Sequence, residues 1–210
     1  MEEKSFWRKN ELIDAALDEF SAHSYQNASL NKIIKNAGIS KGKFYYHFED
    51  KKEFYLFLQE AAYQEQIEFQ DKRMDELVKG SKLDFFEKIK LRTQIGAECA
   101  ASFPKYVQFT MKFLNEKESE ETKEIIEYVN SFVKKNVETR VEEMVTDAVE
   151  AGELSDRFSK EFIIKIVNHF FLHSNEIFGI GEEFDETKFV NDTNNLIDFL
   201  KFGLSSQGGS

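Results

Sequence analysis

The sequence AGISKGKFYYHF, residues 37–48, carries the signals of one helix that ends and of a second helix that begins shortly after it. Gly38 stands where a left-handed residue commonly ends a helix. Ser40 is a good N-cap for a helix that runs from residue 41 to residue 47 or 48, and Ser29 is a good N-cap for the helix before the turn. Two short helices joined by a turn that contains glycine form the helix-turn-helix pattern.

The second of these helices has two unlike faces. At 100° per residue, Phe44 and Phe48 point together and are expected in the core. The opposite side carries basic, aromatic and small residues, namely Gly42, Lys43, Tyr45 and Tyr46, flanked by Lys41 and His47. Such a face suits a polyanion, because lysine neutralises phosphates, tyrosine donates to phosphate oxygens and glycine lets the backbone approach closely.

Charge is segregated along the chain. The formal net charge is −11, yet residues 1–48 contain 7 Lys or Arg and 6 Asp or Glu, and lysines are the only charged residues from 27 to 48 apart from a histidine. A basic turn on an acidic protein indicates DNA as the partner. Solvated lysines and packed tyrosines would give the same pattern, and helix-turn-helix shapes also occur in proteins that do not bind DNA. Spacing alone leaves both interpretations open.

The motif and its flanks resemble one known family. Residues 37–48, with AALDEF (15–20) before them and FEDKKEFYLFL (48–58) after them, closely resemble the DNA-binding signature of the tetracycline-repressor (TetR) family of bacterial transcription regulators. The resemblance covers roughly residues 8–58. It implies a sequence-specific regulator, expected to be a repressor, that binds a palindromic operator as a homodimer in the cytoplasm.

The resemblance gives roles to nine residues. Four of them would lie near base edges: Lys41, Gly42, Lys43 and Tyr46. Three would hold phosphates: Tyr45, His47 and Lys51. Two would lie by the DNA backbone at the start of the preceding helix: Ser29 and Asn31.

The chain departs from the family pattern at two points. Lys43 stands where the family commonly has a small residue such as threonine, so this position can add a base or phosphate contact. The residues His23 to Tyr25 replace a common Gly-Tyr turn.

The rest of the chain predicts an all-α fold. Proline occurs once, glycine is sparse, and apolar residues recur at helical spacing. The resemblance implies about nine helices, with a helix-turn-helix domain over 1–50 and an effector-binding and dimerisation domain over 51–204. The small and polar residues 205–210 predict a disordered tail. Beyond the fourth helix, which starts near residue 50, we expect helices over 83–101, 105–114, 121–151, 160–178 and 186–202.

The last two predicted helices are apolar on more than one side, so each needs two burial partners. One partner is their own domain, and a second subunit is the other, as the resemblance also implies. Burial of both faces within one chain is the alternative. The predicted dimer interface consists of Val167, Phe171, Phe178, Leu196, Phe199 and Leu200.

Aromatic residues are frequent after residue 80, and the resemblance implies a pocket for a small, hydrophobic effector there. The predicted lining is Phe86, Phe109, Phe113, Phe132, His169, Phe170 and His173. The two histidines, four apart, are a weak metal pattern without a third ligand, so we expect no metal.

Several other classes of protein are disfavoured. No catalytic constellation or phosphate-binding glycine loop is recognisable, so we expect neither an enzyme nor a cofactor. The single cysteine, Cys99, favours a buried inert thiol, and no apolar segment is long enough to cross a membrane. A helical ligand-sensing or interaction module without DNA binding remains the alternative to a regulator.

Overall fold

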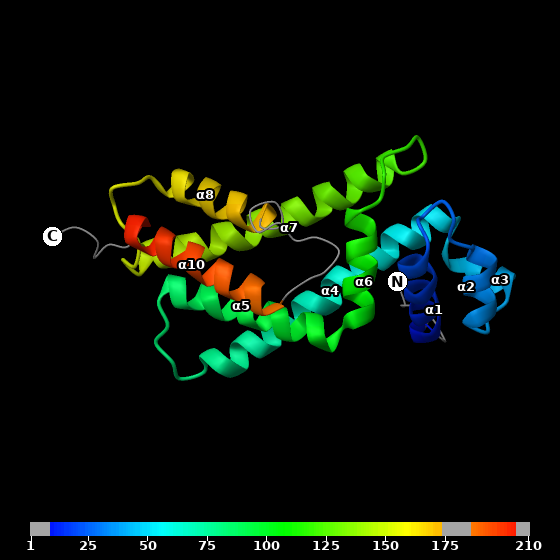
Figure 1. The fold of residues 1–210 in the computed structure, drawn as a ribbon, viewed down its shortest axis with the longest axis horizontal. Coiled ribbons are helices and arrows are strands. Elements are labelled where there is room, and N and C mark those ends of the chain that lie inside the picture. Colours follow the sequence, from blue (N-terminus) through cyan, green and yellow to red (C-terminus); the bar gives the residue numbers. More distant parts are fainter. Residues whose placement is uncertain (1–8, 174–185, 205–210) are drawn as a thin grey trace. The chain divides into compact units, whose positions relative to one another are not determined.

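The computed structural model describes residues 9–173 and 186–204, and in these ranges the chain forms nine α-helices (Figure 1). The all-α prediction is confirmed. The part of the chain that the structure describes contains no helix long and apolar enough to span a bilayer. The helices are α1 (Lys9–Ala22), α2 (Leu30–Asn36), α3 (Lys41–His47), α4 (Lys51–Val78), α5 (Phe85–Ser102), α6 (Pro104–Leu114), α7 (Lys123–Glu150), α8 (Lys160–Leu172) and α10 (Glu186–Leu204).

The chain divides into two compact units, each discontinuous in sequence. Unit 1 contains residues up to 67 together with 102–129, and unit 2 contains 68–101 together with the residues from 130 onward. Unit 1 therefore adds α6 and the first turns of α4 and α7 to the helix-turn-helix segment. The functional boundary expected after residue 50 stays a prediction, and the expected tail lies outside the described residues.

Local capping explains where the short helices of unit 1 begin and end. The Ser29 hydroxyl accepts a hydrogen bond from the Lys32 amide at 3.3 Å, and the Ser40 hydroxyl accepts one from the Lys43 amide at 3.2 Å. Gly38 has a φ of 64°, so the turn between α2 and α3 needs a residue that tolerates the left-handed region. The predicted helix-turn-helix is thus formed by the predicted signals.

Aromatic side chains fill the core of unit 1. Phe20 of α1 lies with its ring centre 4.7 Å from that of Tyr55 in α4, and 6.3 Å from that of Phe109 in α6. Lys105, in the first turn of α6, donates to the carboxylates of Asp14 and Asp18 at 2.6 and 2.7 Å. Packing and ion pairs therefore hold α1, α4 and α6 as one body.

Unit 2 is a bundle in which α5, α7, α8 and α10 enclose an apolar core (Figure 1). Lys90 pairs with Asp198 at 2.5 Å and Lys201 pairs with Asp84 at 2.8 Å, so the start of α5 is tied to the last turns of α10. The core residues are Phe85, Phe86, Ile89, Val141, Val145, Ala148, Leu154, Ile163, Val167, Phe170 and Ile197.

Observed helix boundaries lie close to the predicted ones. The helix predicted over 105–114 begins one residue earlier, because proline is favourable in the first turn. Helix α8 ends at Leu172 with His173 as its C-cap, so the predicted continuation of this helix is wrong at His173, and residues 174–178 lie outside the described residues.

Candidate nucleic-acid interface

Helix α3 presents one polar face and buries the other. Tyr45 and Tyr46 are 54% and 61% exposed, and Lys41 is exposed beside them, whereas Phe44 is fully buried. The ring centre of Phe44 lies 5.4 Å from that of Phe48 and 5.3 Å from that of Phe54. Anchoring of Phe44 therefore turns the two tyrosines outward.

Gly42 lies in the middle of this outward face. A Cβ atom placed on Gly42 would meet no other atom of the chain within 4 Å. Packing within the chain therefore does not require glycine at this position. Glycine does allow an external surface to approach the backbone of α3 more closely than any other residue would.

The remaining predicted contact residues of α3 and α2 lie around this face. Lys43 and His47 are half-buried, and Asn31 is exposed near the start of α2. Ser29 is exposed as well, but its hydroxyl already caps α2. Ser29 therefore has a structural role whether or not it also contacts DNA.

A buried carboxylate that is not among the predicted site residues holds the start of α2. Glu19 of α1 is only 3% exposed, accepts a hydrogen bond from the Ser29 amide at 3.0 Å and pairs with Lys32 at 2.6 Å. The sequence does contain a sign of this buried role, because Glu19 occupies a position on the apolar stripe of α1, between Ala16 and Phe20. A charged residue on such a stripe needs a buried partner.

The environment of Glu19 affects its protonation. Burial alone would raise the pKa of this carboxyl, but the hydrogen bonds from Lys32 and the Ser29 amide and the charges of Lys32 and His23 lower it below the ordinary 4.5. A carboxyl whose pKa is lowered by folding stabilises the fold above its ordinary pKa. That stabilisation is lost as the pH falls through the lower, folded value.

Glu19→Gln is therefore expected to destabilise the protein by about 1–3 kcal/mol at pH 7, because Lys32 loses its carboxylate partner while the amide oxygen can still accept from Ser29. The difference from the wild type should shrink as the pH falls from 4.5, where the carboxyl of the unfolded chain becomes protonated, through the lower pKa of the folded carboxyl. Urea denaturation at several pH values measures this, with exposed Glu11→Gln as the control. An equal difference at all pH values would refute the ionised pair.

Lys51, at the start of α4, points into the protein. Its ammonium donates to the carbonyl oxygens of Tyr25, Gln26 and Ala28 at 2.8, 3.3 and 3.3 Å. The same ammonium lies 4.6 Å from the centre of the Tyr25 ring. Burial lowers the pKa of Lys51, and the nearby Glu121 carboxylate opposes that effect.

The residues predicted to line an effector pocket are distributed over both units. Phe109 and Phe113 are buried in unit 1, whereas Phe86 and Phe170 border a small apolar cavity in unit 2. Phe132 and His173 are half-buried and His169 is exposed. Among the described residues, no group of three potential metal ligands comes together.

The predicted dimer residues of α8 and α10 differ in exposure. Val167 is buried in the unit 2 core, whereas Phe171, Leu196 and Leu200 pack against that core and are half-buried. Phe199 is 74% exposed, and Phe178 lies outside the described residues.

Comparisons with known proteins agree with this geometry. The model of the family described as bacterial regulatory proteins, tetR family, matches residues 12–57. A probable acrEF/envCD operon repressor of Escherichia coli K12 is 28% identical over 111 residues, which are 52% of this chain and 47% of that protein. The icaADBC negative transcriptional regulator IcaR of Staphylococcus aureus (strain Newman) is 40% identical over 47 residues, 22% of this chain and 25% of the relative. The chain thus matches less than half the length of these curated relatives.

Solved structures share the fold along nearly the whole chain. A putative TetR-family transcriptional regulator from Syntrophomonas wolfei has a TM-score of 0.67 at 15% identity, over 92% of this chain and 94% of that one. The regulator FadR of Bacillus subtilis, solved in complex with stearoyl-CoA, has a TM-score of 0.60 at 19% identity, over 96% of this chain and 99% of that one. The matched segment 12–57 spans the capped turn, helix α3 and the start of α4, so the similarity to the tetR family of bacterial regulatory proteins lies in this helix-turn-helix segment.

Proposed function

We propose that this protein is a homodimeric transcription repressor that binds an inverted-repeat operator through α3 and leaves it when a small apolar effector binds. The observation that carries the proposal is the outward face of α3, where Gly42 has open space and Tyr45 and Tyr46 are exposed. The protein would act on DNA in the cytoplasm. The matched family consists of regulatory proteins rather than enzymes.

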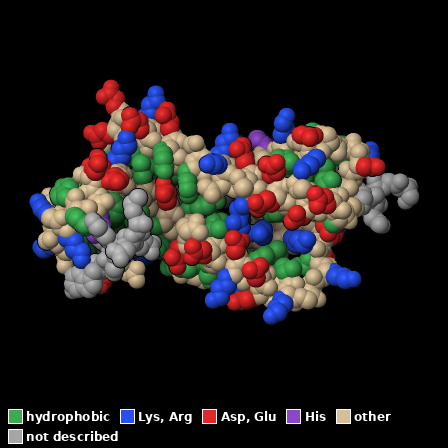
Figure 2. All heavy atoms as spheres, turned by 180° about the vertical axis from the view of Figure 1, so that it is seen from behind, with side chains coloured by type: hydrophobic (Ala, Val, Ile, Leu, Met, Phe, Trp, Pro, Cys, Tyr) green, Lys and Arg blue, Asp and Glu red, His purple; other side chains and the backbone are tan. Residues whose placement is uncertain are grey.

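The face of α3 suits a major groove. The N-terminal residues of a recognition helix contact base edges, while neighbouring residues fix the register on the phosphates. Lys41, Gly42, Lys43 and Tyr46 would then face bases, and Tyr45 and His47 would face phosphates. Acidic side chains are spread over the face shown in Figure 2, with basic ones between them, so DNA affinity depends on the local basic character of α3.

A second copy of the chain would cover the exposed end of α10. Phe199 and Phe202 are 74% and 81% exposed, which is unusual for two phenylalanines one turn apart. In a two-fold dimer each such patch meets the same patch of the partner. Two α3 helices about one turn of DNA apart, roughly 34–36 Å, would then read two half-sites.

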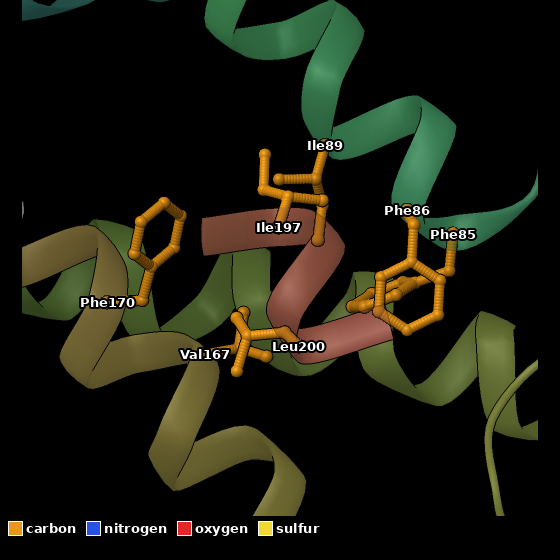
Figure 3. A pocket seen from close by; sticks show the side chains of 7 residues that line it. All are labelled: Phe85, Phe86, Ile89, Val167, Phe170, Ile197 and Leu200. Carbon is orange, nitrogen blue, oxygen red and sulfur yellow. The ribbon is translucent and has the colours of Figure 1, made fainter. Parts of the chain in front are cut away.

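The apolar cavity of unit 2 is the proposed place for the effector. Its seven lining residues come from α5, α8 and α10 and are all apolar (Figure 3): Phe85, Phe86, Ile89, Val167, Phe170, Ile197 and Leu200. The cavity measures only about 10 Å³, whereas ligand pockets commonly measure about 300–1,000 Å³. Effector binding would therefore move these side chains apart. It would favour a conformation that leaves the operator if the effector binds that conformation more tightly than the DNA-bound one.

Selection from a random pool of duplex DNA tests the proposal. We expect the purified protein to enrich an inverted repeat, and the affinity to fall steeply with salt, about 10³-fold between 50 and 200 mM if some six phosphates are neutralised. Refolded protein stripped of bound small molecules is the control, since an effector retained from expression would mask binding. Absence of enrichment by both preparations would favour the sensing module without DNA binding.

A further inference from the structure

We infer that Lys51 is a positioning residue of the DNA-binding domain, which holds the turn at residues 24–28 against the start of α4 and thereby sets the place of α2 and α3. The inference rests on the proposed DNA-binding function and deepens it. It gives Lys51 a different task from the phosphate contact expected from the family resemblance.

The contacts of the Lys51 ammonium carry this inference. An ammonium has three N–H donors, and three carbonyl oxygens lie within 2.8 to 3.3 Å of this one. The centre of the Tyr25 ring lies 4.6 Å from the same ammonium and covers a further part of it. A phosphate could approach only if carbonyl partners were given up, and Tyr25 and Ala28 are buried residues whose carbonyl groups would lose this donor.

The clamped turn is also held by a second segment of the chain. The Tyr25 amide donates to a carboxylate oxygen of Glu116 at 3.0 Å, and the Gln26 side-chain amide donates to the Ser119 hydroxyl at 2.9 Å. Both acceptors belong to the segment between α6 and α7, which is part of unit 1. Lys51 and this segment therefore both hold the same short turn.

The turn leads directly into the helix-turn-helix. Ala28, whose carbonyl accepts from Lys51, precedes Ser29, the N-cap of α2. The Ser29 amide is bound by Glu19, and α2 packs against both α1 and α3. A turn that is no longer clamped would leave the start of α2 less defined, and ordering it at the moment of DNA binding would lower the affinity.

The test compares Lys51→Met with Lys41→Met, which removes the same charge from the exposed face of α3. Operator affinity is measured at several salt concentrations, at a temperature where circular dichroism shows that each variant is fully folded. A lower affinity then reports a change in the position of α2 and α3 and not unfolding. We expect Lys51→Met to bind about tenfold more weakly with an unchanged salt slope, because ordering the turn opposes binding. Lys41→Met should reduce the slope by about one unit. A slope reduced by about one unit in Lys51→Met would overturn the inference.

A second measurement uses the wild-type chain and does not depend on a variant that folds. Lysine amines are acylated with a water-soluble active ester, with and without operator DNA, and quantified by mass spectrometry. We expect Lys51 to be protected already without DNA and unchanged by DNA, whereas Lys41 becomes protected only in the complex. A Lys51 amine that reacts freely and becomes protected on DNA would refute the clamp. Failure of the proposed function looks different, since DNA would then leave Lys41 unprotected while protection of Lys51 in the free protein persists.

Discussion

Replacing Tyr46 with alanine is expected to weaken binding to the selected operator by about 5- to 150-fold, which corresponds to about 1–3 kcal/mol for one good base contact. Tyr46 is 61% exposed on the same face of α3 as Gly42, so truncation removes surface that DNA would cover and little of the core. Binding to unrelated duplex DNA should change much less, because phosphate contacts supply most of the non-specific affinity.

The measurement is a titration of operator and of scrambled duplex by fluorescence anisotropy at one fixed salt concentration. Tyr128→Ala is the matched control, since Tyr128 is also an exposed tyrosine of unit 1 but lies on α7. The control should bind both duplexes like the wild type. Equal operator affinity of Tyr46→Ala and wild type would show that α3 does not use this residue for recognition.

Phe44→Ala is expected to lower the free energy of unfolding by about 3–5 kcal/mol, the usual cost of removing a buried phenylalanine ring. Phe44 is fully buried, and its ring packs against Phe48 and Phe54 with centre distances of 5.4 and 5.3 Å. Collapse of neighbouring rings into the space would misplace α3. DNA binding should therefore fall together with stability.

Urea denaturation followed by circular dichroism measures the loss. Tyr45→Ala, a truncation of the adjacent but 54% exposed ring, should cost about 1 kcal/mol or less. A loss of similar size in both variants would contradict the assignment of Phe44 as the anchor of α3.

Local signals explain why the helix-turn-helix could be predicted from the sequence. Ser29, Ser40 and Gly38 act on hydrogen bonds within a few residues of themselves, so their effect is visible in the sequence. The outward face of α3 followed from helical periodicity alone, once Phe44 was assigned to the core.

Contacts between distant segments could not be predicted in the same way. The sequence gives no sign that Lys51 meets the carbonyl of Tyr25, 26 residues earlier, or that the Tyr25 amide meets Glu116, 91 residues later. A lysine in the first turn of a helix looks the same whether it points to solvent or into the protein. The side on which it lies depends on how α1 and α4 cross, which is a property of the packed core.

Aromatic content likewise did not reveal which phenylalanines share a cavity. Phe109 and Phe86 have similar apolar surroundings in the sequence, yet they belong to different compact units. Both satisfy the same hydrophobic requirement, so composition alone cannot separate core residues from the lining of a binding site.

The open space around Gly42 has a consequence for how this chain can evolve. Alanine would fit there without a clash and would favour the helix by up to about 1 kcal/mol, so selection for thermal stability alone would replace the glycine. Retaining glycine at this position is a trade-off in which stability is lost in favour of activity. Laboratory evolution toward heat resistance, carried out without selection for DNA binding, would then replace Gly42 early, on the face of α3 proposed to contact the operator.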